Sequence, residues 1–170
     1  MKTGFSNQFS FQTLVFVLLV ALLGSCKNDD ADTGTDYFVR FNANGQKVEF
    51  KVHGSLVAAF GQSGSQYNAV FTGYDANTNI SLQVFDNKAI VPATFTGYSL
   101  SGSTFVGALI GYQDNTGTLY TQGAVTPNST ITITELTSAA VRGTFSGTVK
   151  ATGKSDISIT NGEFYVWRAN

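Results

Sequence analysis

The stretch VRGTFSGTVKA, residues 141–151, indicates the fold class, because its side chains alternate between two chemical kinds. One set is apolar or small and consists of Val141, Gly143, Phe145, Gly147 and Val149. The other set is polar and consists of Arg142, Thr144, Ser146, Thr148 and Lys150. Successive side chains of an extended strand point to opposite faces of a sheet, so this period of two predicts a strand with one face buried and one face in water.

The same alternation continues through most of the chain after residue 36 and predicts an all-β domain. The expected strands span residues 37–43, 46–53, 55–62, 66–74, 79–85, 88–98, 104–112, 118–124, 130–136, 141–151, 157–160 and 163–168. Asn44-Gly45 and Asn161-Gly162 are expected turns, since both residue types tolerate a positive φ. Pro92 predicts an edge strand or a break. About ten short strands at this spacing are typical of an antiparallel β-sandwich or of a calycin-like β-barrel, and the pattern does not choose between the two.

The first 25 residues predict a lipoprotein signal peptide that is removed on maturation. LVFVLLVALL, residues 14–23, has the length of a signal-peptide core and is shorter than a membrane-spanning helix. Leu23-Gly24-Ser25-Cys26 then ends the run with small residues and the one cysteine of the sequence, as in a bacterial lipobox. Cys26 is therefore the expected lipid-attachment site and the expected contact with the membrane, because two or more acyl chains anchor a protein stably.

Residues 26–36 predict a flexible acidic tether, since the segment is rich in Asp and Thr and poor in apolar residues. The opening Cys26-Lys27-Asn28-Asp29-Asp30 resembles the export signal of surface lipoproteins in Bacteroidota. This resemblance implies a location on the outer face of the outer membrane. The alternative is a plain linker, which leaves open whether the domain faces the periplasm or the cell surface. Residues 37–170 have the length of one domain.

Composition excludes several classes of function. The 170 residues carry 10 Lys and Arg against 11 Asp and Glu, with no basic run, so nucleic acid is not an expected partner. A single cysteine allows no disulfide within the chain, so the hydrophobic core must hold the domain together. Low charge combined with many Thr, Gly and aromatic residues is typical of extracellular β proteins.

The C-terminal third is similar to a family of uncharacterised Bacteroidota lipoproteins. The similarity lies in ITIT at residues 131–134, GTFS at 143–146 and ITNGEF at 159–164, the last expected to form a closing hairpin. The hairpin around Asn44-Gly45 fits the opening of the same family. The resemblance implies location and an all-β fold, and it implies no catalytic or binding residue.

Candidates for chemistry are few. His53 is the one histidine and is expected to be exposed at a strand end, so no transition-metal site is expected. Asp75-Ala76-Asn77-Thr78-Asn79 has the oxygen spacing of a calcium loop, but Ile80 stands where that loop needs Gly, so a polar turn is expected. Glu49, Glu135 and Glu163 are the acids that a glycosidase pair would need, and a solvated face is the expected environment of each. No cofactor motif is present, and we expect a protein that is not an enzyme.

Tyr165 and Trp167 are the candidate ligand-binding residues, because they alternate with Phe164 and Val166 and should point away from the core. Exposed Tyr and Trp rings on a sheet stack on sugars or anchor a protein partner. We therefore expect a lipid-anchored binding module that captures a glycan or another nutrient. The alternatives are an envelope assembly or adhesion protein that contacts other proteins, and a calycin-like barrel for a small apolar ligand.

Overall fold

The computed structural model describes residues 36–122 and 128–169. The expected signal peptide, Cys26 and the tether as far as residue 35 lie outside these ranges. No helix among the described residues has the length and apolar character needed to cross a membrane. The core is formed within a compact unit, Gly34–Asn170, so we expect this unit to fold without residues 1–33.

The described residues form an all-β domain, as predicted. The strands are β1 (Phe38–Ala43), β2 (Gln46–Phe50), β3 (Val57–Ser63), β4 (Gln66–Tyr74), β5 (Asn79–Asp86), β6 (Thr94–Thr96), β7 (Tyr98–Ser101), β8 (Thr104–Gln113), β9 (Leu119–Thr121), β10 (Thr130–Leu136), β11 (Ala140–Val149) and β12 (Ile157–Arg168). A single 3₁₀ turn, His53–Ser55, lies between β2 and β3.

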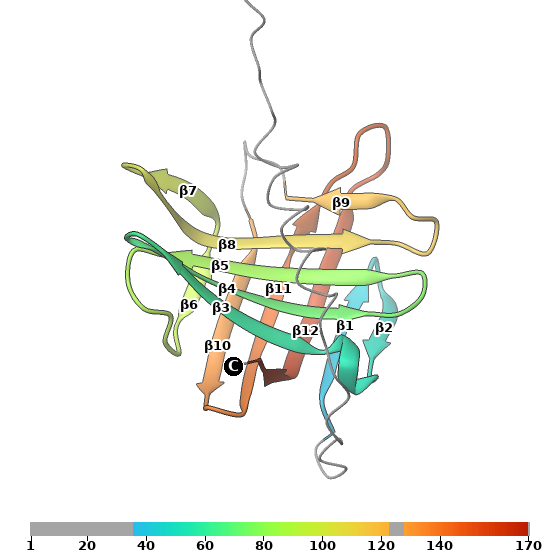
Figure 1. Ribbon diagram of the computed structural model, residues 1–170. Helices are drawn as coiled ribbons and strands as arrows, with labels where there is room; N and C mark the ends of the chain where they lie inside the picture. Colours follow the sequence, from blue (N-terminus) through green and yellow to red (C-terminus); the bar gives the residue numbers. More distant parts are fainter. Residues whose placement is uncertain (1–35, 123–127, 170) are drawn as a thin grey trace, which may run out of the picture. The chain divides into compact units, whose positions relative to one another are not determined.

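The strands form one hydrogen-bonded sheet that folds into two layers (Figure 1). The first layer has the order β6-β10-β11-β12-β1-β2. The second has the order β3-β4-β5-β8, with β7 and β9 sharing the free edge of β8. Figure 1 shows the second-layer strands, in green and yellow, running across the orange and red strands β10–β12.

The end of β12 joins the two layers. Along one edge β12 pairs first with β1, and then Trp167 and Arg168 pair with Val57 and Ala58 of β3 in parallel. Where β9 approaches the end of β11, the two layers are linked only by an isolated bridge between Thr121 and Lys150. The sheet does not close into a barrel, so the sandwich prediction is confirmed and the calycin-like barrel is wrong.

Aromatic side chains fill the space between the layers. Phe164 of β12 stacks on Phe71 of β4, with ring centroids 4.8 Å apart, and both side chains are fully buried. Phe41 of β1 meets Tyr112 of β8 edge to face at 5.5 Å. These contacts join the first layer to the second, so the apolar positions of the alternating pattern form one common core.

Asn161-Gly162 does not form the expected closing hairpin. The strand continues through it as β12, and Asn161 has a φ of 53°. The pairing register shifts at this point on both edges of β12. An extra residue of positive φ inside a strand is a β-bulge, and Asn tolerates that conformation almost as Gly does. The same two residues that favour a turn therefore also fit a bulge between paired neighbours.

Three other expected strands are clearly shorter than predicted. The strand predicted over 46–53 ends at Phe50. The segment predicted over 88–98 contributes β6, which begins at Thr94, two residues after Pro92, and the first residue of β7, Tyr98. Proline lacks the N–H that a ladder needs, so Pro92 lies in the predicted break, and β6 after it is an edge strand of the sheet. Of the strand predicted over 118–124, only Leu119–Thr121 forms a strand within the described residues.

The expected polar turn after β4 is confirmed. The Asp75 carboxylate accepts hydrogen bonds from the backbone N–H groups of Asn77 (2.8 Å) and Thr78 (2.7 Å). These bonds hold the pKa of Asp75 below its ordinary value. The carboxylate therefore acts as a turn cap, and no group of three or more potential ligands among the described residues is placed to hold a metal.

Candidate functional site

Tyr165 and Trp167 both lie on the face of β12 that points away from the core. Their strand neighbours Phe164 and Val166 are fully buried, whereas Tyr165 and Trp167 are half-buried. The two rings therefore point away from the core, as the alternating sequence pattern predicts. We use "outer face" below for the side of the first layer that is turned away from the core.

Neighbouring rings join Tyr165 and Trp167 into what we call the aromatic cluster, which consists of Tyr37, His53, Tyr165 and Trp167. Tyr37 lies 5.0 Å from Tyr165 and 5.4 Å from His53 between ring centroids. The His53 ring is nearly parallel to the Trp167 indole, at 4° and a centroid distance of 6.0 Å. Sequence reasoning identified two of the four members and missed the other two.

The course of the chain explains why His53 belongs to the cluster. The His53–Ser55 turn carries the chain from β2, at the edge of the first layer, to β3, which pairs with the end of β12. The Ser55 hydroxyl donates to the Val52 carbonyl at 2.8 Å and fixes the turn. Trp167 pairs with Val57, so the turn just before β3 lies beside the indole. His53 is exposed as predicted, but it stands in a turn and not in a strand.

The indole Nε1 of Trp167 is buried and has no hydrogen-bond partner among the residues that the structure describes. A buried donor without a partner costs about 1–3 kcal/mol, so such groups are uncommon in native structures. Because the nitrogen has no exposed surface, a ligand could accept from it only if neighbouring side chains moved.

A hollow of about 360 Å³ lies beside the cluster. It is lined by Asp36, Tyr37, Phe38, Arg40, Glu49, Lys51 and His53. Rings and charged groups of both signs therefore surround one concave surface. Such a mixture suits a ligand that has both an apolar surface and many hydroxyl groups.

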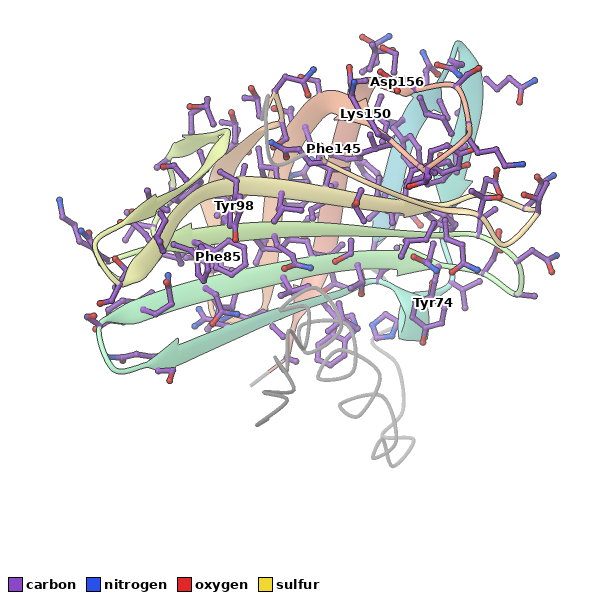
Figure 2. The ribbon with its side chains drawn as sticks, turned by 90° about the horizontal axis from the view of Figure 1, so that it is seen from above. Tyr74, Phe85, Tyr98, Phe145, Lys150 and Asp156 are labelled. Atoms are coloured by element: carbon purple, nitrogen blue, oxygen red, sulfur yellow. The ribbon has the colours of Figure 1, made fainter. Side chains whose placement is uncertain are left out.

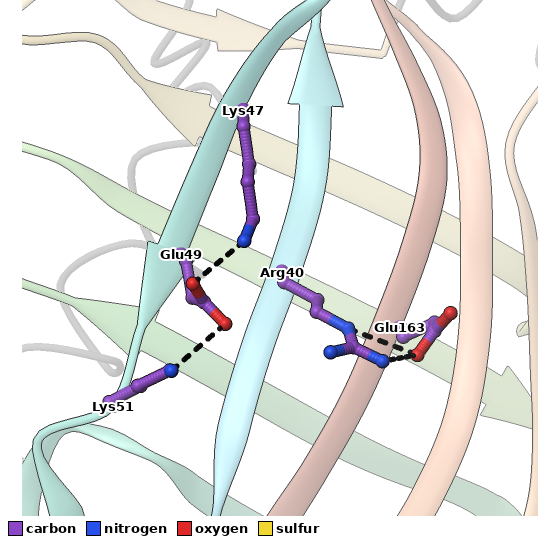
Figure 3. Close-up of polar contacts among 5 residues, drawn as sticks. All are labelled: Arg40, Lys47, Glu49, Lys51 and Glu163. Carbon is purple, nitrogen blue, oxygen red and sulfur yellow. Dashed lines mark hydrogen bonds and ion pairs between the residues drawn. The ribbon is translucent and has the colours of Figure 1, made fainter.

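The charged residues of this region form one ion pair between strands β1 and β12 and two along β2 and the residue that follows it (Figure 3). Nε and Nη2 of Arg40 both donate to Oε2 of Glu163, at 3.1 and 2.5 Å. Glu49 lies between Lys47 (3.0 Å) and Lys51 (3.4 Å), and the hydrogen bond from Lys47 is the main cause that lowers the pKa of Glu49. The carboxylates of Glu49 and Glu163 thus each face a cation, and they hold the long basic side chains over the sheet.

A second hollow of about 560 Å³ lies farther along the outer face. It is lined by Thr130, Thr144, Phe145, Ser146, Thr160, Asn161, Gly162 and Glu163. Four of these side chains carry hydroxyl groups, but more of the exposed lining is apolar than polar, and the bulge at Asn161 forms one side. Arg40 lines the first hollow and its partner Glu163 lines the second, so this ion pair lies between them.

Cross-strand pairing arranges the outer face in rows. One row crosses all six strands of the first layer, from β6 to β2, and consists of Thr94, Thr132, Thr144, Glu163, Arg40 and Glu49. Neighbouring strands lie about 4.8 Å apart, so the five steps of this row span roughly 24 Å. The face is therefore long enough to contact several units of a linear polymer.

The chain was compared with protein-family models, with curated proteins and with solved structures, and none of the three comparisons finds a match. Any inference about function therefore rests on the geometry of the outer face. The similarity to a lipoprotein family in the C-terminal third stays a prediction.

Proposed function

We propose that this protein is a non-enzymatic carbohydrate-binding lipoprotein, and that the outer face of the first layer is its glycan-binding surface. The observation that carries the proposal is the aromatic cluster beside a hollow lined with charged side chains. A pyranose presents C–H groups on its flat faces and hydroxyl groups around its rim. The rings supply apolar contact, and the carboxylate, ammonium and guanidinium groups supply hydrogen bonds to the hydroxyls.

Two further features support a polymeric glycan. The hydroxyl-lined hollow continues the same face beyond the Arg40–Glu163 pair. The row of polar side chains that runs from Thr94 to Glu49 across the first layer supplies further hydrogen-bonding groups. Together they provide hydrogen-bonding groups along the face rather than at a single point, which is the arrangement that a chain of sugars requires.

Replacing Trp167 with alanine is expected to weaken binding of the glycan selected from a polysaccharide screen by about tenfold or more, because the ring and its N–H are removed together. The W167F variant keeps an aromatic ring without the N–H and should lose less affinity. Isothermal titration calorimetry on Gly34–Asn170 measures both, with thermal unfolding as a check of folding.

Phe85 provides the matched control. It is half-buried and lies beside Tyr98 on the second layer, with ring centroids 6.2 Å apart (Figure 2). The F85A variant removes a ring of similar exposure from outside the outer face and should bind the glycan as the wild type does. An equal loss of affinity in F85A and W167A would show that the outer face is not the site.

The location at the outer membrane is the second part of the proposal, and it is supported by the apolar run at residues 14–23 followed by Leu23-Gly24-Ser25-Cys26. The C26S variant has no sulfur for the diacylglycerol group. It is expected to lose palmitate labelling and to leave the membrane fraction when the full precursor is expressed in a bacterium. Labelling that persists in C26S would contradict lipid attachment at this residue.

A second candidate function is contact with another protein. Val57, Ala59, Val70 and Leu109 are half-buried apolar side chains on the side of the second layer that points away from the core. An assembly or adhesion subunit would use such a surface. Sedimentation measurements distinguish the two functions, because a glycan-binding module is expected to stay monomeric and an assembly subunit to associate.

A further inference from the structure

The three arginines of the sequence all lie against aromatic rings, but their guanidinium groups are occupied to different extents. Arg40 lies 4.5 Å from the Phe38 ring centroid, and two of its nitrogens donate to Glu163. Arg168 lies 4.6 Å from the ring centroid of Phe60, and its Nη1 donates to a backbone carbonyl at 3.1 Å. Both groups are therefore engaged within the protein.

Arg142 has a looser partner in Glu135, which lies opposite it in the register of β10 and β11. Its guanidinium carbon lies 4.2 Å from the centroid of the Tyr165 ring. Its closest acid is Glu135, with Nε and Oε2 3.8 Å apart, which is beyond hydrogen-bond distance. Within the described residues neither Nη1 nor Nη2 has a hydrogen-bond partner, and half of the side chain is exposed to solvent. The ring thus orients a guanidinium group whose donors remain available.

The acids near Arg142 compete only weakly for its guanidinium group. The second acid near Arg142 is Glu163 of β12, and its charge is neutralised by Arg40. Glu135 is 57 % exposed, so an ion pair with it contributes little and a ligand displaces it at small cost. Thr144, two residues along β11, begins the hydroxyl-rich part of the face. Arg142 therefore lies between the aromatic cluster and the hydroxyl-lined hollow.

We propose that Arg142 binds the carboxylate of an acidic sugar, so that the preferred ligand of the outer face is a polyuronate. A guanidinium group pairs with a planar carboxylate through two parallel hydrogen bonds, and it keeps its charge at any physiological pH. The inference deepens the proposed glycan-binding function and rests on it. It adds what that function leaves open, which is the charge of the glycan and the residue that selects it.

The test compares two ligands with the same backbone, polygalacturonate and its methyl ester, and it includes alginate as a second polyuronate. Wild-type Gly34–Asn170 is expected to bind the acid forms about tenfold more tightly than the ester. The R142M variant should lose this preference. The R142K variant keeps the charge but not the two-pronged geometry, and it should lose most of the preference as well. Thermal unfolding confirms that each variant is folded.

Two variants sharpen the result. K88M removes one positive charge from a loop outside the outer face and should keep the preference, which separates a local contact from net charge. E135Q removes the competing carboxylate and should tighten polyuronate binding about two- to threefold. We therefore expect no change in the preference from K88M and tighter polyuronate binding from E135Q. R142M, by contrast, should lose the preference.

The outcomes separate this inference from the proposed function. If the ester or a neutral glycan binds the wild type as tightly as the acid forms, and R142M changes neither, the role of Arg142 is wrong while glycan binding stands. If K88M lowers the preference as much as R142M, the effect is one of overall charge and the assignment to Arg142 is overturned. If no polysaccharide binds, acidic or neutral, the proposed function itself is contradicted.

Discussion

Replacing Phe164 with alanine is expected to lower the free energy of unfolding by about 3–5 kcal/mol, the usual cost of emptying a fully buried aromatic site. Phe164 is 0 % exposed, and its ring stacks on Phe71 at 4.8 Å and meets Phe145 at 6.4 Å. Phe71 belongs to the second layer, and Phe145 and Phe164 belong to the first. Removing the ring leaves a cavity at the contact between the layers, which the extended strands cannot refill without breaking their pairing.

Urea unfolding of Gly34–Asn170, followed by far-UV circular dichroism, measures this loss. The F38A variant is the control, because Phe38 is opposite Tyr165 in register but is half-exposed. Its effect should stay below about 1 kcal/mol. Similar losses in the two variants would mean that Phe164 is not at the centre of the core.

Replacing Gly143 with alanine is expected to cost about 3 kcal/mol or more, although only one methyl group is added. A Cβ at this position would lie 2.1 Å from the carbonyl oxygen of Thr132 and 2.5 Å from Cζ of Phe164. The Thr132 oxygen belongs to the backbone of a paired strand. The Cζ atom belongs to the Phe164 ring, which packs against Phe71. Neither can move away without disrupting the pairing of β10 with β11 or the contact between the layers.

Gly111 of β8 offers a matched control. It also lies within a paired strand, yet a Cβ there has no heavy atom within 4 Å. Alanine at this position should be neutral or stabilise the domain by up to about 1 kcal/mol, since glycine is entropically unfavourable in a strand. Equal urea midpoints for G143A and G111A would contradict the close approach of β10 and Phe164 to Gly143.

The alternating pattern was sufficient to predict the β-strands because it reports which side of a strand is buried. It predicted the outward direction of Tyr165 and Trp167 for the same reason. It did not distinguish a sandwich from a barrel, since that depends on how the edge strands pair, and here only Thr121 and Lys150 bridge β9 to the end of β11. Asn161-Gly162 was misassigned as a turn because a turn and a bulge use the same positive φ.

The remaining parts of the site depend on contacts between distant segments. Tyr37 and His53 reach Tyr165 and Trp167 only because β1 pairs with β12 and β3 continues along its edge. Arg142 faces Tyr165 because β11 is in register with β12. Within one strand, Arg142 is simply a polar residue of the solvent face. Its free guanidinium donors become evident only when its neighbours are in place.

The most direct test of the glycan-binding surface is a heteronuclear NMR titration of Gly34–Asn170 with the oligosaccharide that binds best in the polysaccharide screen. We expect saturable shift changes at the Trp167 indole N–H and at Tyr37, Arg142 and Tyr165, which form the aromatic cluster or contact it. Changes confined to the second layer, around Val70 and Leu109, or no saturable change with any glycan, would contradict this expectation.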